Sequence, residues 1–230
     1  MKKGQCIGLI GGLGVGAAVY YYTKLAEAHD KQGVSLDLVM THAETSSIFR
    51  FASAGDQDGM AAYLLGFVKR LAAAGAEFAV IPAVTPLFCI RKLAAISPLP
   101  LLTIAAPVAE ALSAQSIKRV ALFGTRYVME SDFYGLIPGV EFVHPQPSEL
   151  DTIHAIYTEI ANMHIATSEQ RTCLTSLAQT LLGRERAHAI ILAGTDFVVA
   201  FDETNTDFPA IDCAALHIEA ITRAALENAG

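Results

Sequence analysis

The sequence lacks the features that mark a membrane protein or a nucleic-acid-binding protein. No apolar run reaches the roughly 18 residues of a membrane span, because the glycine-rich turn Gly11-Gly12-Leu13-Gly14 interrupts the N-terminal stretch. Acidic residues (23) outnumber basic residues (16), which gives a net charge of −7. Nucleic-acid-binding domains usually gather Lys and Arg on one face. We therefore expect neither a membrane nor a nucleic acid as a partner.

Cysteine is scarce, and its spacing fits no metal or redox motif. The four cysteines are Cys6, Cys89, Cys173 and Cys213, without a CxxC pair. We expect no metal site, and thiols of this kind suit the reducing cytoplasm. Cys6 and Cys89 are expected to be buried core thiols. Cys213 follows the last expected strand and is a weak candidate for a site residue.

The composition favours a globular α/β protein. The chain has 230 residues, of which 53% are apolar and only 17% are charged. This length allows a sizeable core, and short apolar runs bounded by loops are typical of parallel strands buried on both faces. An oligomer interface would also use apolar surface, so a homodimer is the default expectation. The lysines after Met1 and the apolar stretch that follows superficially resemble a signal peptide, but the glycines favour a strand, a turn and a helix.

Two pairs of similar segments predict an internal duplication. The stretch Ala79 to Thr85 resembles Ala189 to Asp196, and each apolar run stops at a threonine, Thr85 in one and Thr195 in the other. Two further strand-like segments end at Gly11 and Gly124, and these glycines are separated by nearly the same interval as the threonines. Two echoes at nearly one period indicate two similar α/β halves that face each other across a ligand cleft.

The order of strands and helices repeats in the two halves. Strands are predicted at about 5–10, 35–42, 78–82 and 100–103, and again at 119–123, 140–143, 188–193 and 210–212. Helices are predicted at 15–30, 58–74, 86–95, 107–114, 129–136, 148–163, 168–183 and 213–228. The last helix is expected to return to the first half. The expected lobes are therefore 1–103 plus 210–230, and 104–209.

The same segments resemble the aspartate/glutamate racemase family, the cofactor-independent amino-acid racemases. The glycine-rich turn, the start of the second half at Leu122-Phe123-Gly124-Thr125-Arg126 and the tail Ile211 to His217 are similar to segments of that family. The family's Pro-Cys-Asn-Thr reads Pro82-Ala83-Val84-Thr85 here, and its Gly-Cys-Thr-Glu reads Ala193-Gly194-Thr195-Asp196. The resemblance runs from about residue 5 to 225. It implies a two-lobed fold, no cofactor, and a small amino acid or carboxylate as ligand.

The resemblance is broken where the family places its catalytic cysteines. Racemisation without a cofactor needs two acid/base groups, one on each face of the Cα atom, and cysteine, with an ordinary pKa of about 8.5, suits that task. The two expected cysteine positions are Ala83 and Gly194, which carry no titratable atom. The hydroxyls of Thr85 and Thr195 are too weakly acidic to act alone. We expect these two threonines to hold a substrate carboxylate.

Other polar residues at the expected strand ends are candidates for the site. Histidine is the residue type whose ordinary pKa lies closest to neutrality, and Asp196 stands where the family has its glutamate, so His42 and Asp196 are the catalytic candidates. The expected substrate-binding residues are Gly11, Gly12, Glu44, Thr85, Thr125, Arg126, Thr195 and His217. Thr125 fits a helix N-cap and Arg126 a solvated charge equally well. His217 could instead form a structural pair with Asp212.

Three classes of function fit these residues. The first is an isomerase-like enzyme with atypical, non-cysteine proton transfer by His42 and Asp196. The second is a lyase or decarboxylase on the same scaffold, and the third is a non-catalytic protein that binds an amino acid or dicarboxylate. Residues 12–17 also fit a relaxed dinucleotide pattern, with Glu44 as the ribose-binding acid, but the duplication disfavours an NAD-dependent dehydrogenase. The deciding feature is whether a titratable side chain reaches the space left by Ala83 or Gly194.

Overall fold

The computed structural model describes residues 2–202 and 204–227, which form two compact units. The first unit comprises the residues up to Ile104 together with those from Ala214 onward, and the second unit spans Ala105–Cys213. Residues 210–213, expected in the first lobe, belong to the second unit. The reason is that β10 (Ala210–Asp212) pairs in parallel with β9 (Ala189–Leu192).

The first unit contains a four-stranded parallel sheet between helices. Its strand order is β4-β2-β5-β6. The strands are β2 (Ile7–Gly11), β4 (Leu38–His42), β5 (Phe78–Val80) and β6 (Leu101–Leu102). A separate pair joins β1 (Lys2–Lys3) to β3 (Val34–Ser35).

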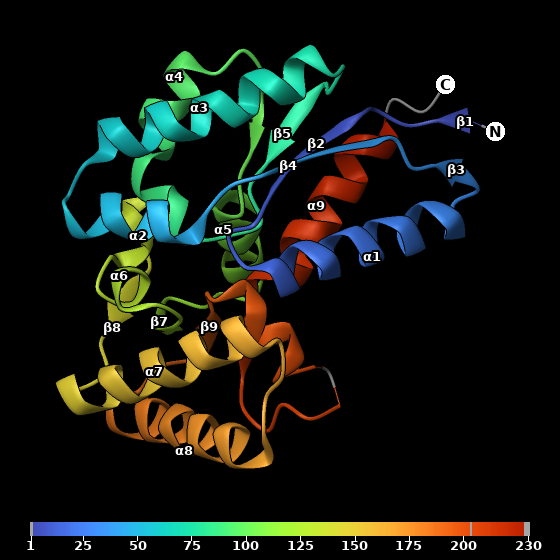
Figure 1. Cartoon of the computed structure of the whole chain (residues 1–230). Coiled ribbons are helices and arrows are strands. Elements are labelled where there is room, and N and C mark those ends of the chain that lie inside the picture. Colours follow the sequence, from blue (N-terminus) through green and yellow to red (C-terminus); the bar gives the residue numbers. More distant parts are fainter. Residues whose placement is uncertain (1, 203, 228–230) are drawn as a thin grey trace. The chain divides into compact units, whose positions relative to one another are not determined.

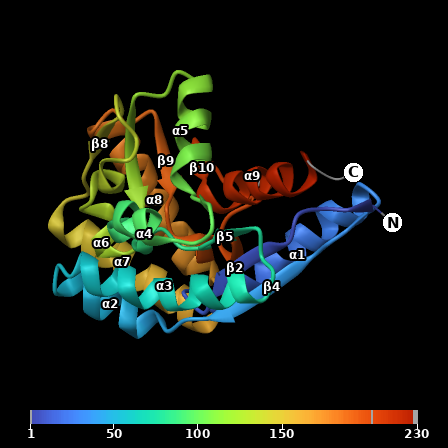
Figure 2. The ribbon, with the colours of Figure 1, turned by 90° about the horizontal axis from the view of Figure 1, so that it is seen from above.

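Helices cover both faces of this sheet. Figure 1 shows α1 (Val15–Lys31) and α9 (Cys213–Glu227) on one side. The other side carries α2 (Thr45–Ser53), α3 (Gln57–Ala73) and α4 (Ile90–Ile96). Seen from above in Figure 2, β2 and β4 run beside α1. The last helix therefore packs with the first half, as the sequence predicts.

The second unit repeats the same sheet. Its strands are β7 (Arg119–Phe123), β8 (Glu141–Val143), β9 and β10, all parallel, in the order β10-β9-β7-β8. Numbered along the chain within its own sheet, each set of strands has the order 2-1-3-4. The helices of this unit are α5 (Ala105–Ala114), α6 (Arg126–Met129), α7 (Pro147–Met163) and α8 (Ser168–Arg184).

The third strand of each sheet leads into a similar turn. A 3-10 helix, η1 (Thr85–Cys89), follows β5, and another, η3 (Thr195–Val199), follows β9. The Leu87 N–H donates to the carbonyl of Val84 at 2.9 Å, and the Phe197 N–H donates to that of Gly194 at 3.0 Å. These equivalent hydrogen bonds are separated along the chain by the same interval as the two threonines. The duplication predicted from the sequence is thus present in the strand order and in the turns.

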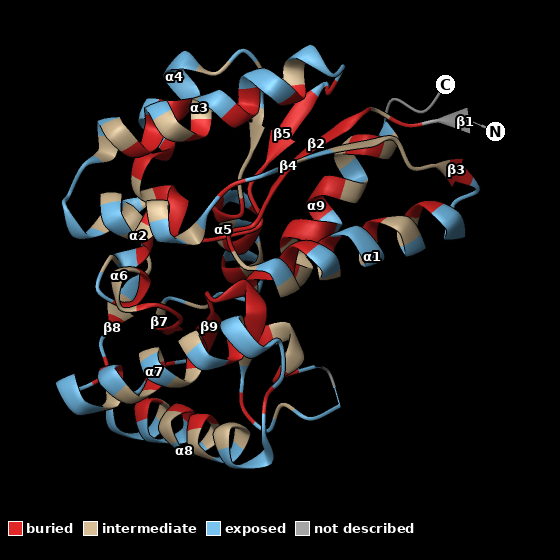
Figure 3. Ribbon diagram, viewed as in Figure 1, coloured by how far each residue is buried: buried red, intermediate tan, exposed pale blue. Residues whose placement is uncertain are grey.

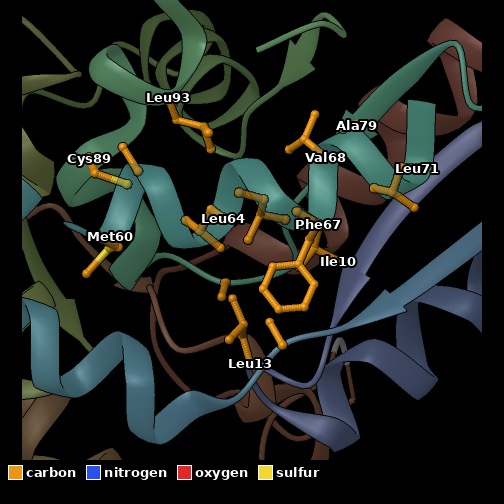
Figure 4. Packing of buried hydrophobic residues seen from close by; sticks show 14 of the residues in the cluster. Ile10, Leu13, Met60, Leu64, Phe67, Val68, Leu71, Ala79, Cys89 and Leu93 are labelled. Carbon is orange, nitrogen blue, oxygen red and sulfur yellow. The ribbon is translucent and has the colours of Figure 1, made fainter. Parts of the chain in front are cut away.

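The core of the first unit lies between the sheet and α3. Leu64, Val68 and Leu71 recur at helical spacing and are fully buried, and they pack with Ile10 of β2 and Ala79 of β5 (Figure 4). Full burial of one such side chain contributes roughly 1.5–3 kcal/mol. The central strands are buried throughout, whereas the edge strand β4 is only partly covered (Figure 3).

Two segments differ from the sequence-based expectation. The polar stretch after His42, expected as a loop, becomes the helix α2 from Thr45 onward. The helix expected at 129–136 is replaced by the short helix α6 and a 3-10 turn, η2 (Asp132–Gly135). Every residue of this turn has a positive φ, from 45° to 65°. Such a left-handed run is unfavourable for residues with a Cβ atom and leaves no periodic pattern in the sequence.

Within the described residues, no helix is both long and apolar enough to cross a bilayer. The cysteines at 6, 89 and 213 are buried thiols.

Gly12 gives a first testable consequence of this fold. Its φ is +85°, and a Cβ atom built there would overlap the carbonyl oxygen of Ala43 and lie 2.8 Å from Cε1 of His42. We expect Gly12→Ala to lower the free energy of unfolding in urea by about 1–3 kcal/mol. Gly66→Ala in α3 is the matched control, because its Cβ atom would enter open space and alanine favours the helix. Equal free energies of unfolding for Gly12→Ala and Gly66→Ala would contradict the requirement for glycine at position 12.

Candidate functional site

The glycine-rich turn and the loop after β4 are held together at the carboxyl ends of their strands. Gly11 pairs with His42 in the sheet register. The Ala43 N–H donates to the Gly11 carbonyl at 2.9 Å, and the Thr45 hydroxyl donates to the Gly12 carbonyl at 2.8 Å. Because ligands of doubly wound folds bind outside these strand ends, this carboxyl end of the sheet is the candidate site of the first unit.

His42 and Glu44 lie at this edge, as predicted, and both side chains are exposed. The imidazole of His42 lies against Gly12, and its Nε2 atom is 3.8 Å from Oε1 of Glu44. Glu44 is the N-cap residue of α2, and its N–H donates to the Tyr63 hydroxyl at 2.9 Å. The sequence candidates Gly11, Gly12, His42 and Glu44 are therefore brought together.

Ala83, the first expected cysteine position, lies in apolar surroundings. Ala83 and Thr85 are buried after β5. Ala83 lines a hollow of about 10 Å³ in which, among its described lining residues, only Thr103 has a polar side chain. β2 separates β5 from β4, and two inter-strand spacings amount to about 10 Å. His42 therefore lies at the same end of the sheet as Ala83, on a strand two positions away.

His217, expected to bind substrate, has a structural role within the first unit. It is fully buried, and burial lowers its pKa to about 4. The neutral ring donates from Nε2 to the Leu102 carbonyl at 3.1 Å and accepts at Nδ1 from the Tyr21 hydroxyl at 3.1 Å. Both ring nitrogens are used in tying α9 to β6 and α1, which leaves neither nitrogen for a ligand.

Thr125 and Arg126 follow the first strand of the second unit. Thr125 caps α6, since its hydroxyl oxygen accepts from the Val128 N–H at 3.3 Å. This is the capping alternative foreseen from the sequence. The partly exposed guanidinium of Arg126 forms ion pairs with Glu130, at 3.1 Å, and with Asp151. Arg126 also lines a hollow of about 430 Å³ with Glu130, His144, Pro145, Pro147 and Leu150.

Gly194, the second expected cysteine position, faces a tyrosine of α7. A Cβ atom built on Gly194 would overlap the ring of Tyr157, whose Cδ2 and Cζ atoms lie 2.7 Å from that point. The Tyr157 hydroxyl donates to Oδ2 of Asp196 at 3.2 Å, and both side chains are buried. A titratable pair therefore lies beside Gly194. No such pair is described beside Ala83.

The tyrosine is fixed by aromatic packing. Its ring centroid lies 4.9 Å from that of Phe197, which in turn lies 6.5 Å from Phe123 and 6.2 Å from Phe201. Burial, and then the charge of Asp196, raises the pKa of Tyr157 well above its usual range. At neutral pH the phenol therefore keeps its proton and acts as a hydrogen-bond donor.

The two other cysteines considered for the site do not supply a thiolate. Burial raises the pKa of Cys89 to about 12, and its thiol donates to the Pro86 carbonyl at 3.4 Å. Burial also raises the pKa of the fully buried Cys213. Across the described residues, no group of three or more His, Cys, Asp or Glu side chains is placed to hold a metal ion.

Sequence reasoning missed Tyr157 because its position in α7 has an ordinary explanation. Tyr157 follows Ile153 and precedes Ile160 on the buried side of the helix, which is the pattern of core residues. A glycine at position 194 was the only sequence signal that a neighbour could fill that space.

The two 3-10 turns also set a backbone alignment between the halves. The alignment that matches Phe197 with Leu87 matches Gly194 with Val84, because each pair forms the equivalent turn hydrogen bond. Position 83 is then matched with position 193, which is also an alanine. This alignment, like the one drawn from the family resemblance, gives no titratable side chain at these positions.

Two four-stranded parallel sheets of the same order, each followed at its third strand by a turn that begins with threonine, define a duplicated α/β protein. The sequence profile of the Asp/Glu/hydantoin racemases matches residues 10–221, and the chain belongs to this family.

Solved structures agree with this assignment. A candidate Asp/Glu racemase from Yersinia pestis is 26% identical, with a TM-score of 0.82 over 98% of this chain and 100% of that one. An aspartate racemase homologue from Pyrococcus horikoshii is 24% identical, with a TM-score of 0.80 over 96% and 99% of the two chains. Glutamate racemase from Francisella tularensis, in complex with D-glutamate, is 12% identical, with a TM-score of 0.70 over 98% of this chain and 82% of that one. The last two likenesses show a shared fold.

The contact between Gly194 and Tyr157 predicts a coupled effect on stability. Gly194→Ala should lower the free energy of unfolding by about 1–3 kcal/mol, because the new methyl group overlaps a packed ring. In a double-mutant cycle with Tyr157→Ala, the two losses should not add, since the smaller side chain makes room for the methyl group. Gly183→Ala in α8, where a Cβ atom meets nothing within 4 Å, is the control. Its effect on the free energy of unfolding should simply add to that of Tyr157→Ala. Additive losses for Gly194 and Tyr157 would show that the ring does not occupy this space.

His217 predicts a specific loss of stability in acid. Its pKa falls from the usual 6.5 to about 4 in the folded protein, so the unfolded chain binds a proton first as the pH falls. The contribution is complete above pH 6.5 and is lost between pH 6.5 and 4, up to about 3 kcal/mol. Urea unfolding of His217→Gln should show a shallower pH dependence in this window. The substitution His164→Asn, at an exposed histidine, is the control and should leave the pH dependence of the free energy of unfolding unchanged. An unchanged pH dependence in His217→Gln would contradict a buried neutral imidazole at position 217.

Proposed function

We propose that the protein binds a small amino acid or related carboxylate and acts on its Cα–H bond as an isomerase-like enzyme without a cofactor and without catalytic cysteines. Membership of the racemase family supports the substrate class. The observation that carries the proposal is the buried carboxylate of Asp196 beside Gly194. It supplies an acid/base group close to position 194, one of the two positions where the family resemblance leads us to expect a thiol.

His42 is the candidate proton carrier of the first unit. Its exposed imidazole lies at the carboxyl end of β4, against the glycine-rich turn, and a histidine titrates in the range that general acid/base catalysis needs. The backbone N–H groups of Gly11 and Gly12 and the hydroxyls of Thr85 and Thr195 are the proposed carboxylate-binding groups.

A second candidate function is that of a binding protein without turnover. The Tyr157 ring beside Gly194 and the apolar surroundings of Ala83 favour it, because neither position itself offers a titratable side chain. A lyase or decarboxylase needs a proton donor on only one side of its substrate. Asp196 alone is enough for that chemistry.

We also propose that the protein works in the cytoplasm as a homodimer. The four free cysteines suit a reducing compartment. Val15, Val19 and Tyr22 are exposed at helical spacing on α1, which is apolar surface that a second copy could cover.

Proton NMR in D₂O tests the proposed activity. L- and D-aspartate, L- and D-glutamate and simple dicarboxylates are incubated with the protein, and loss of the signal of a Cα–H proton is the expected result. Asp196→Asn and His42→Asn should each slow this exchange by about 100-fold or more, because each removes a general acid/base group. His164→Asn, an exposed histidine outside the site, should leave the rate unchanged.

Different outcomes separate the alternatives. Ligand signals that broaden without exchange would favour the binding protein. Release of CO₂ or of another fragment would favour the lyase. Racemisation of aspartate at a rate comparable with that of a two-cysteine relative, or full activity in both Asn variants at positions 42 and 196, would refute the proposed mechanism.

A further inference from the structure

Tyr157 is the side chain that takes up the space beside Gly194. Helix α7 presents its ring to the strand-to-turn segment that contains Gly194, Thr195 and Asp196, and contacts between α7 and η3 run along this segment. A side chain at position 194 and the present position of the Tyr157 ring exclude each other. The absence of a side chain at 194 and the presence of a tyrosine at 157 are therefore one structural feature.

The hydroxyl of this tyrosine has a defined partner. It donates to Oδ2 of Asp196 at 3.2 Å, and the carboxylate is only 2% exposed. A buried carboxylate has lost its hydrogen bonds to water and therefore needs donors from the protein in their place. A hydrogen bond to a charged group is also among the stronger ones in proteins.

The surroundings keep this donor in place. The ring of Phe197 packs against that of Tyr157 at a tilt of 51°, with centroids 4.9 Å apart, and is itself packed against Phe123 and Phe201. From α8, the guanidinium of Arg171 donates to the carbonyls of Val199 and Ala200, at 3.2 Å and 2.9 Å, and so fixes the end of η3. Both ends of the hydrogen bond are thus attached to rigid parts of the second unit.

We infer that Tyr157 is a positioning residue that holds the Asp196 carboxylate for proton transfer at the second expected cysteine position. The inference rests on the proposed function. In the reaction, the Cα proton of the substrate moves to a carboxylate oxygen of Asp196, and the electron pair of the broken C–H bond stays on the substrate, delocalised into its carboxylate group. A proton given to the opposite face of the carbanion, by His42 in the proposed function, completes the isomerisation, and Asp196 then releases the proton it took to water, which restores its carboxylate. The phenol keeps its own proton throughout.

The test compares Tyr157→Phe with the wild type in the D₂O exchange assay over a range of pH. The phenylalanine keeps the ring and removes only the hydroxyl. We expect the maximal exchange rate to fall about 10- to 100-fold, in line with the loss of a hydrogen bond to a charged group, while the substrate concentration at half-maximal rate stays the same. The acid limb of the pH profile should move to higher pH, because the charged form of the carboxylate loses a donor that stabilises it.

Tyr134→Phe is the matched control. It removes a tyrosine hydroxyl of the same unit that donates to a backbone carbonyl, that of Tyr127, at 3.3 Å, and it should change neither the rate nor the pH profile. Thermal unfolding of both variants checks that they are folded. Should Tyr157→Phe fail to fold, 3-fluorotyrosine at position 157 keeps the ring and the hydroxyl but makes the phenol a stronger donor. It should then shift the acid limb to lower pH.

The outcomes distinguish the inference from the proposed function. A Tyr157→Phe protein with the rate and pH profile of Tyr134→Phe would overturn the positioning role and leave the proposed function intact. An unmoved acid limb in the fluorotyrosine protein would do the same. A wild-type protein that exchanges no Cα–H proton in any ligand of the panel would refute the proposed function and, with it, this inference.

Discussion

Strands that are buried on both faces restrict where this protein can place polar chemistry. The central strands of both sheets carry apolar side chains over nearly their whole length, because an unpaired polar group between a sheet and its covering helices would be destabilising. Polar and titratable residues therefore gather where the strands end. The glycine-rich turn, His42 and Glu44 lie at one such edge in the first unit, and Thr195 and Asp196 lie in the turn after β9 in the second.

The two units use their strand ends differently, although their sheets have the same order. After β5 the chain enters an apolar environment around Ala83, whereas after β9 it enters a segment where a carboxylate accepts a hydrogen bond from a phenol. The exclusion between the Tyr157 ring and a side chain at position 194 accounts for this difference in the second unit. Proton chemistry in this family member is consequently expected to depend on oxygen acids and histidine instead of thiols.

Much of the fold could be predicted from the sequence, because its signals are local. The short apolar runs indicated the strands, and the spacing between the two threonine turns indicated the duplication. The left-handed run Asp132–Gly135 has no such local signal, and residues 45–47 have the polar composition of a loop, yet the chain continues there as α2. Of the candidate site residues, His42 could be predicted from its place at a strand end and Asp196 from the family resemblance, and both lie at the ends of strands. The role of Tyr157 could not, because it depends on a contact with a residue far along the chain, and the burial of His217 could not, because its partners Tyr21 and Leu102 are distant in sequence.

The pairing of a buried phenol with a carboxylate at position 196 is the central claim, and the titration of Tyr157 tests it most directly. The protein is labelled with ¹³C at the ζ carbon of tyrosine, and its NMR spectrum is followed as the pH is raised, with Tyr157 assigned from the spectrum of its phenylalanine variant. The signal of Tyr157 should stay at the shift of a protonated phenol well above the usual range, since burial and Asp196 raise its pKa. In Asp196→Asn, which removes the neighbouring charge, it should ionise at a lower pH. A Tyr157 signal that ionises in the usual range of tyrosine, or that does not respond to Asp196→Asn, would contradict this account.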